Sequence, residues 1–350
     1  MSRYINFIGA VGMYVLTIAT LEAAELQPSR MKAGTPKQGW SLAFDNDLLA
    51  GGARDKDFTY GLNFTQKGGS QNGVLNPARF RSGIDKVFKL HRPGAAKIQG
   101  NSLELGLYGF TPEDISRESV IEDDRPYASL VYAASTQTTL DVPSQEAVSS
   151  SFSLGVLGLD LVGSLQNNLH ASVDGEEAMG WANQISAGGE LTARYTLSKQ
   201  RLLPPVLGLE SKSTWQISLG YITEASYSLG FRQGLIDSHW WEFDPELTIY
   251  AENASNANSS VRERYVWGGV AVKARAYNSF LQGQARSSAH TYNSNDLRHF
   301  LLEAWAGYTH SFANHYRFSY VLRAHSSEIK AGNGDRSLVW GGVVFSKNLQ

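Results

Sequence analysis

The stretch WQISLGY, residues 215–221, alternates large apolar side chains with small or polar ones, and this alternation decides the fold. The same period of two returns at WSLAF (40–44), TYGLNFT (59–65), SLELGLY (102–108) and VWGGVAVKA (266–274). Alternation of this kind is typical of β-strands whose two faces meet different environments. The mature chain is therefore built from strands.

About twelve runs of this kind follow one another along the chain. They lie near 38–47, 58–67, 101–110, 127–140, 147–158, 184–198, 213–223, 227–250 (in one or two pieces), 262–277, 279–288, 298–311, 315–327 and 337–346. Because these ranges exceed twelve, at least one of them is not a separate strand.

The polar side of the strands favours a barrel over a soluble sandwich. Its residues are mostly Gly, Ser, Thr, Gln and Tyr, which suits a hydrated interior, and aromatic residues such as Tyr60, Tyr108 and Tyr308 gather near strand ends. A sheet in a membrane has to close, because an open edge leaves backbone groups unpaired in hydrocarbon. We predict an all-β fold: one closed antiparallel transmembrane β-barrel of about 12 strands.

Composition narrows the function classes. The chain has 350 residues, 18% of them charged, a formal net charge of −2 and no cysteine. A charge this close to neutral gives no reason to expect nucleic acid as a partner. The absence of cysteine excludes disulfides and thiolate chemistry. After the N-terminus no apolar run reaches the roughly 20 residues of a spanning helix.

The first 24 residues predict export. Arg3 precedes an apolar stretch from about residue 4 to 19, and the small residues Ala23 and Ala24 follow. This order is typical of a secretory signal peptide, with a short membrane anchor as the alternative. We expect the signal at 1–24, and a single barrel domain over 25–350 in the outer membrane of a Gram-negative bacterium.

Polar clusters stand where strands end. They are Phe44-Asp-Asn-Asp47, Asp57-Phe-Thr-Tyr-Gly61 and the segment GVLGLDLVGSLQNNLH at 155–170. Successive antiparallel strands alternate in direction, so these clusters fall at one end of the barrel. The last cluster predicts a short helix in an extracellular loop, which places Gln166 and His170, four residues apart, on one face.

Six motifs then occur in a fixed order along the chain, and together they resemble the outer-membrane lipid A 3′-O-deacylase family, the LpxR-like proteins. They are FDND at 44–47, Asp57-x-Thr59-x-Gly61, Thr111-Pro112-x-Asp114-Ile115, DRPYA at 124–128, Gly155-x-x-Gly158 with Gln166-x-x-x-His170, and Gly180-Trp181-x-x-Gln184.

The resemblance implies a calcium-dependent enzyme that removes the 3′-linked acyloxyacyl group of lipid A. It implies that Asn46 and Asp47 lie in the active site near the metal, that Thr59 supports the site, that Gln166 forms its wall and that His170 is the general base. It also implies lipid A or lipopolysaccharide as substrate, contact with outer-membrane lipids, and an active site facing the cell surface. We expect a monomer.

These residue types suit ester hydrolysis. Imidazole is a base that accepts a proton from water near neutral pH. A hard divalent cation stabilises the oxyanion that forms on the carbonyl, and carboxylate, amide and backbone oxygens are the ligands that calcium takes. We expect direct attack by water, with Asn46 and Asp47 at the metal.

Simpler interpretations stay open for several residues. Asn46-Asp47 is also a common turn sequence. An ion pair in the barrel wall explains Asp124-Arg125 better than binding of a substrate phosphate, which is the alternative. Glu176 and Glu177 suit a solvated loop better than a metal site. The remaining histidines are expected to be structural or solvated: His91, His239, His290, His299, His310, His315 and His325.

Two other functions fit the same compartment. An outer-membrane phospholipase would also be a barrel, although no Ser-His set comparable to the one known for such enzymes is evident. A non-catalytic barrel, either a narrow channel or an adhesive surface protein, would release no fatty acid.

Overall fold

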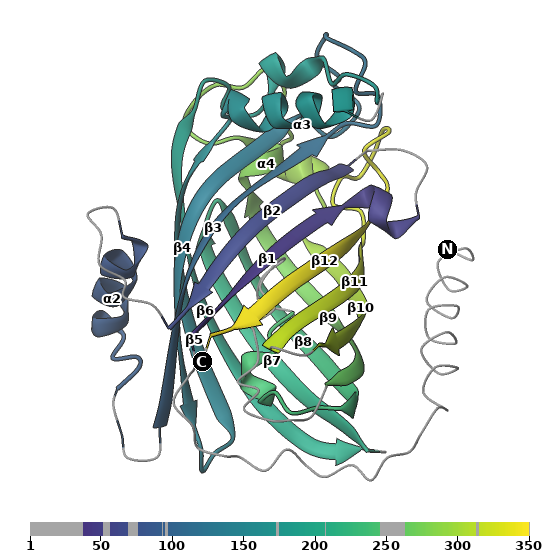
Figure 1. Ribbon diagram of the computed structural model, residues 1–350. Coiled ribbons are helices and arrows are strands. Elements are labelled where there is room, and N and C mark those ends of the chain that lie inside the picture. Colours follow the sequence, from purple (N-terminus) through teal and green to yellow (C-terminus); the bar gives the residue numbers. More distant parts are fainter. Residues whose placement is uncertain are drawn as a thin grey trace.

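Twelve antiparallel strands close into one barrel (Figure 1), confirming the predicted fold class. The structure is a computed structural model that describes residues 38–51, 57–68, 76–92, 94, 97–172, 175–206, 208–245, 263–312 and 315–349. The strands are β1 Gly39–Asn46, β2 Asp57–Lys67, β3 Lys97–Thr111, β4 Ala128–Asp141, β5 Glu146–Leu157, β6 Glu190–Val206, β7 Leu209–Gly220, β8 Ile222–Leu235, β9 Arg264–Asn278, β10 Phe300–Ser311, β11 Tyr316–His325 and β12 Leu338–Asn348. The proposed signal peptide lies outside the described residues.

Closure comes from the first and last strands. β1 pairs with β2 on one side and with β12 on the other, so Asp45 stands opposite Gly61 and Gly342. Every other strand pairs with its neighbours in the chain. This ring leaves the sheet without an edge, as a membrane requires.

The alternation along β7 shows how the two faces divide. Trp215, Ile217 and Leu219 are 62%, 58% and 62% exposed and point outward, whereas Gln216 and Ser218 between them are buried. Apolar residues thus form the outer surface and polar residues the interior. This arrangement suits a barrel surrounded by lipid.

Buried charges in the interior are paired. Glu224 contacts Arg275 at 2.7 Å and Arg194 at 3.4 Å, and Glu303 contacts Arg323 at 3.3 Å. They border a cavity of about 150 Å³ inside the barrel. Such pairing is what makes a buried charge tolerable.

One predicted strand is wrong. Residues 279–288 begin with the short helix α4, Ser279–Gln282, because the Asn278 side chain accepts a hydrogen bond from the Phe280 backbone N–H at 3.1 Å and caps the turn. Phe280 is buried against Tyr108 and Phe110. The range predicted at 227–250 also changes, since β8 ends at Leu235 and a 3₁₀ turn, η3, follows at Trp240–Glu242.

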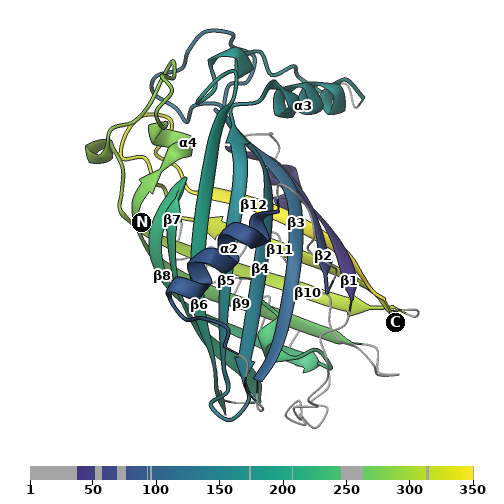
Figure 2. The same cartoon turned by 90° about the vertical axis from the view of Figure 1, so that its left-hand side faces the viewer.

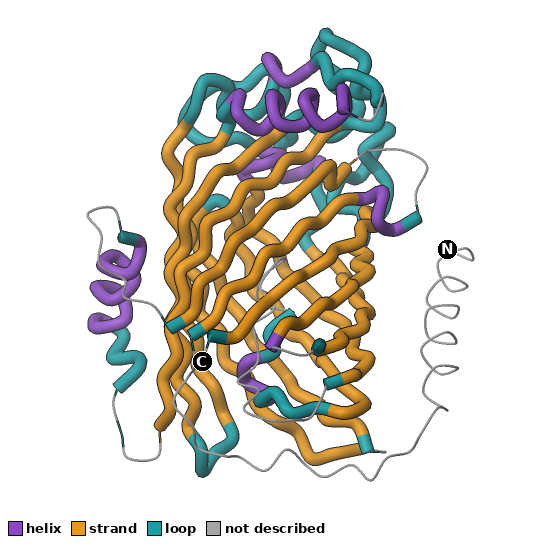
Figure 3. The backbone as a smooth tube through the Cα atoms, viewed as in Figure 1, coloured by secondary structure: helices purple, strands orange, loops and turns teal. Residues whose placement is uncertain are grey.

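The helices lie at different places around the barrel. Helix α3, Asp160–Ser172, belongs to the β5–β6 connection and covers one end, which we call the α3 end (Figures 1 and 3). Helix α2, Pro77–Val87, belongs to the β2–β3 connection and lies against the outer wall over β4 and β5 (Figure 2). Among the described residues, no helix combines the length and apolar character needed to cross a membrane.

Candidate functional site

Helix α3 starts from a turn that only glycine can make. Gly158 directly follows β5 and has φ of 70°, and a Cβ there would lie 2.1 Å from the Ser186 carbonyl oxygen. The Gly158 backbone N–H donates to the Ser129 carbonyl at 3.0 Å. This close approach directs the chain from the barrel wall into α3, which confirms the helix predicted within residues 155–170.

The inner face of α3 is fixed by a buried tryptophan. Trp181 lies in the 3₁₀ turn η2, Gly180–Asn183, and its indole N–H donates to the Gln166 side-chain oxygen at 2.7 Å. A Cβ on Gly163 would lie 2.5 Å from this ring, so glycine lets the helix approach it. Tyr127 packs edge-on against the same ring, with 5.0 Å between ring centroids. Gln166 is therefore buried where α3 meets η2.

His170 lies in the last turn of α3, on the same side of the helix as Gln166, and is half-buried. Its Nδ1 hydrogen-bonds the backbone carbonyl of Glu176, while the Gly175 N–H donates to the His170 carbonyl at 2.8 Å. Because a carbonyl oxygen can only accept, Nδ1 must carry the proton. In the neutral ring, Nε2 is then the nitrogen that bears the lone pair. The Glu176 side chain is exposed, as expected for a loop.

Asn46 and Asp47 form a buried turn at the end of β1. The Asn46 side-chain oxygen accepts the Leu48 backbone N–H at 2.7 Å and caps the 3₁₀ turn η1, Asp47–Ala50, which Gly51 ends with φ of 77°. Both side chains are at least 94% buried although Asp47 is acidic. The expected turn is present, and it holds a carboxylate and an amide oxygen out of bulk water.

A second buried carboxylate, Asp45, was not among the predicted site residues. It is 1% exposed and faces the interior, opposite Gly342. A Cβ on Gly342 would lie 1.9 Å from the Asp45 Oδ1 atom, so that glycine makes room for the carboxylate. The signal was present in the sequence, because Asp45 belongs to the same FDND motif.

Thr59 lies where β2 is irregular. The register between β2 and β3 shifts between Phe58 and Tyr60, so the Thr59 backbone occupies a bulge at the α3 end. Its side chain is outside the described part of the chain.

The structure places the backbones of all five predicted residues at the α3 end. Turn η1 lies mainly against β12 and β2, and α3 lies mainly over β3, β4 and η2. Strands β2 and β3 are neighbours, so the two halves of the candidate site stand on adjoining parts of the wall (Figure 1).

Other connections brace this end of the barrel. Asp124 pairs with Arg336 at 2.7 Å, and its carboxylate accepts the backbone N–H groups of Glu113 and Arg125 at 2.8 and 2.6 Å. The Tyr292 hydroxyl donates to the Asp124 carbonyl at 3.0 Å, and burial raises the pKa of Tyr292 to about 12, so it stays protonated. Asp124 thus joins the β3–β4 connection, to which it belongs, to the β9–β10 and β11–β12 connections.

Comparison with known proteins places this architecture in a family. The family model described as "Outer membrane protein LpxR" matches residues 12–349. The chain belongs to the LpxR family. It is therefore an outer-membrane protein, as its barrel indicates.

A solved structure supports the same fold. LpxR from Salmonella typhimurium superposes with a TM-score of 0.67 at 15% identity, covering 89% of this chain and all of that one. The β domain of the Bordetella autotransporter BrkA follows with a TM-score of 0.43 at 8% identity, covering 89% of this chain and 99% of that one. No curated protein sequence matches the chain.

The residues of this LpxR-family chain fit calcium in type. Calcium takes six to eight oxygens from carboxylates, carbonyls and waters. Asp47 and Asn46 offer two such side chains, both buried. In the described ranges no three His, Cys, Asp or Glu side chains group as a metal site, so backbone carbonyls, water and substrate would have to complete the shell.

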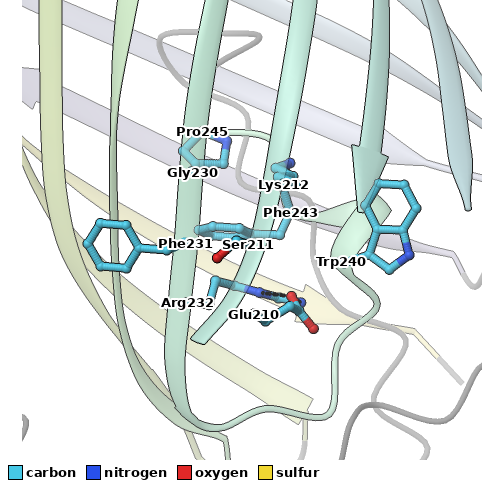
Figure 4. Close-up of a pocket in the computed structure, with 9 residues that line it drawn as sticks. All are labelled: Glu210, Ser211, Lys212, Gly230, Phe231, Arg232, Trp240, Phe243 and Pro245. Carbon is cyan, nitrogen blue, oxygen red and sulfur yellow. Dashed lines mark hydrogen bonds and ion pairs between the residues drawn. The ribbon is translucent and has the colours of Figure 1, made fainter. Parts of the chain in front are cut away.

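A small pocket at the opposite end is a poor candidate for a lipid site. β7, β8 and the β8–β9 connection form it, and Arg232 reaches Glu210 across it while lying over the Phe243 ring at 4.9 Å (Figure 4). Its volume is about 10 Å³, room for one water molecule. The pocket is therefore too small to hold an acyl chain.

Proposed function

We propose that this chain is a lipid A deacylase that hydrolyses the 3′-O-linked acyloxyacyl ester with His170 as general base. The observation that carries the proposal is the His170 imidazole, whose Nδ1–H is held by the Glu176 carbonyl at the barrel end that also holds the buried Asn46-Asp47 turn. Membership of the LpxR family supports the choice of substrate.

The hydrogen bond to Glu176 suits His170 for this role. It fixes the ring orientation and selects the tautomer whose Nε2 accepts a proton. Water attacks the ester carbonyl carbon while Nε2 takes its proton, and the imidazolium then returns that proton to the departing 3′ oxygen of the sugar. The products are a carboxylic acid and a free hydroxyl, and because water attacks the ester directly, this route needs no covalent intermediate on the protein.

Asn46 and Asp47 would hold the cation. When bound, calcium would supply positive charge beside the carbonyl oxygen as it becomes an oxyanion. Gln166 positions α3 through Trp181, so that His170 keeps its place over the barrel mouth. Thr59, in the bulge beside η1, would support the same region.

An apolar stripe on α3 supports a lipid substrate. Leu161, Leu165 and Leu169 follow one another at four-residue spacing and are 51%, 41% and 47% exposed. The stripe flanks the face that carries Gln166 and His170. Exposed apolar surface beside a polar centre suits a substrate with acyl chains. We propose that this end faces the cell surface, where lipid A lies.

Incubation of purified protein with lipid A and with phosphatidylethanolamine, in calcium or in chelator, tests the proposal. We expect fatty acid only from lipid A, and only with calcium. Release from phosphatidylethanolamine would identify a phospholipase, and release from neither lipid would identify a non-catalytic barrel; either result rejects the proposal.

A matched pair of variants tests the base. His170→Asn is expected to lower kcat by about 10²- to 10⁴-fold. His299→Asn is the control, because His299 also lies at the α3 end with its Nδ1 on a backbone carbonyl, that of Arg275 at 2.8 Å. Equal activity of the two variants would exclude His170 as the base.

A further inference from the structure

Helix α2 buries charged side chains and exposes apolar ones, which is the reverse of an amphipathic helix in a soluble protein. Arg81 and Asp85 are buried against the barrel, each 5% exposed. Phe80, Val87 and Phe88 are instead 54%, 75% and 65% exposed. A helix with water on its outer side normally buries its apolar residues and exposes its charges. The outer side of α2 therefore suits a medium other than water.

The buried side of α2 binds polar groups on the outer wall. Arg81 contacts Asp85 at 2.6 Å and donates to the side chains of Gln137 at 2.8 Å and Ser135 at 3.4 Å. The Ser150 hydroxyl donates to Asp85 at 3.0 Å. The Tyr195 hydroxyl on β6 also donates to Asp85, at 2.8 Å, so the buried pair is held by side chains of β4, β5 and β6.

These wall positions belong to the lipid-facing side of the sheet. Gln137 pairs with Ser150, which pairs with Leu197, which in turn pairs with Ile217. Ile217 is 58% exposed and points outward, and residues paired across antiparallel strands point to the same side. Polar side chains facing hydrocarbon without partners cost several kcal/mol each. Helix α2 supplies those partners on the outside of the barrel (Figure 2).

The remaining surface of α2 divides into an apolar and a basic flank. At 100° per residue, Phe80, Ile84 and Val87 share an arc of about 60°, and Arg79 and Lys86 lie together beyond it. Residues 76–92 hold five Lys and Arg but one Asp, although the whole chain has a net charge of −2. An apolar flank next to a basic one is typical of helices that bind anionic membrane surfaces.

We propose that α2 is embedded in the membrane beside the barrel and binds anionic phospholipid. Its apolar flank contacts acyl chains, and Arg79, Lys86, Lys89 and Arg92, all exposed, contact the phosphate headgroups. The buried Arg81–Asp85 pair fastens the helix to the wall. In the orientation proposed above, this lies in the leaflet away from lipid A, so α2 is a lipid site separate from the candidate active site.

A spin label tests the position of α2, since the chain has no cysteine of its own. Val87→Cys carries the label in phosphatidylglycerol vesicles, Ile217→Cys is the lipid-facing control and Ser119→Cys, exposed at the α3 end, is the aqueous control. We expect the ratio of oxygen to nickel-chelate accessibility at 87 to equal that at 217 and to be several times that at 119. A ratio equal to that at 119 would place α2 in water, or beneath a soluble partner, and overturn the proposal.

Titration with short-chain phosphatidylglycerol tests the charge. Each basic residue at a membrane surface contributes about fivefold to binding, so Lys86→Gln is expected to shift the midpoint about fivefold and Lys86→Gln with Lys89→Gln about twentyfold or more. Lys330→Gln, exposed at the other end, is the matched control and is expected to shift nothing. Equal binding of phosphatidylcholine, or midpoints unmoved by both α2 variants, would refute a site for anionic lipid. Hydrolysis of lipid A enters neither measurement, so failure here is distinct from failure of the deacylase proposal.

Discussion

Replacing Trp181 with Phe tests most sharply how Gln166 acts. The indole N–H and the Gln166 oxygen meet at 2.7 Å, and the two side chains are 7% and 1% exposed. Trp181→Phe removes the donor and Gln166→Met removes the acceptor, so each leaves a buried polar group with one hydrogen bond fewer. The cost is about 1–3 kcal/mol, which corresponds to about 5- to 150-fold in the docking equilibrium of α3.

The assay is kcat/KM for lipid A, measured by mass spectrometry for the wild type, both single variants and the double variant. If Gln166 only positions α3, each single change lowers kcat/KM by at most about 150-fold. The double change then costs scarcely more than either single change, because both break one contact. Trp215→Phe on the outer wall, where Trp215 is 62% exposed, is the control and is expected to have no effect.

Two results would refute this reasoning. A loss well beyond 150-fold for Gln166→Met, with Trp181→Phe almost unaffected, would show that the Gln166 amide touches the substrate. Strictly additive losses in the double variant would show that the two residues act independently.

Three further predictions concern stability and metal. Arg336→Met leaves the Asp124 carboxylate buried without its cation and is expected to destabilise the fold by about 3–5 kcal/mol, seen as a lower temperature for the heat-modified gel shift; an unchanged temperature would contradict it. Gly158→Ala places a methyl group against the Ser186 carbonyl and is expected to lower activity while the barrel stays folded; full activity would show that the turn adapts. Removal of calcium with a chelator is expected to abolish hydrolysis reversibly, and Asp47→Asn is expected to raise the calcium concentration that hydrolysis requires. Hydrolysis that is unchanged by the chelator and by Asp47→Asn would exclude the proposed cation site.

Much of the fold was predictable because a membrane barrel repeats one pattern. The alternation in residues 215–221 reflects lipid on one side and a polar interior on the other. The sequence therefore indicated both that the segment is a strand and which of its side chains point outward. The error at 279–288 has a local cause. The sequence Ser279-Phe-Leu-Gln alternates weakly, but Asn278 caps a helical turn and Phe280 packs into the barrel mouth, and neither contact shows in a period.

The candidate site was predictable in part. Successive strands run in opposite directions, so the number of strands before a residue predicts the end of the barrel at which it lies. This count placed Asn46-Asp47 and His170 at the same end. The pairing of Asp124 with Arg336 joins residues 212 positions apart, which no local pattern indicates.

The sequence of β4 indicates that its outer face is covered, as α2 covers it in the structure. The β4 run Ser135-Thr-Gln-Thr-Thr139 lacks outward apolar residues, and a polar outer wall needs a cover. Nothing in that run says which segment supplies it, because Arg81 reaches Ser135 from 54 residues away.

Mass spectrometry of lipid A from a host that retains both 3′ acyl chains is the most direct test of the central claim. Cells expressing the wild-type chain are expected to show lipid A lighter by the 3′ acyloxyacyl group, and cells expressing His170→Asn at the same level to show unmodified lipid A. An identical loss with His170→Asn, or unmodified lipid A from folded wild-type protein in the outer membrane, would contradict the account.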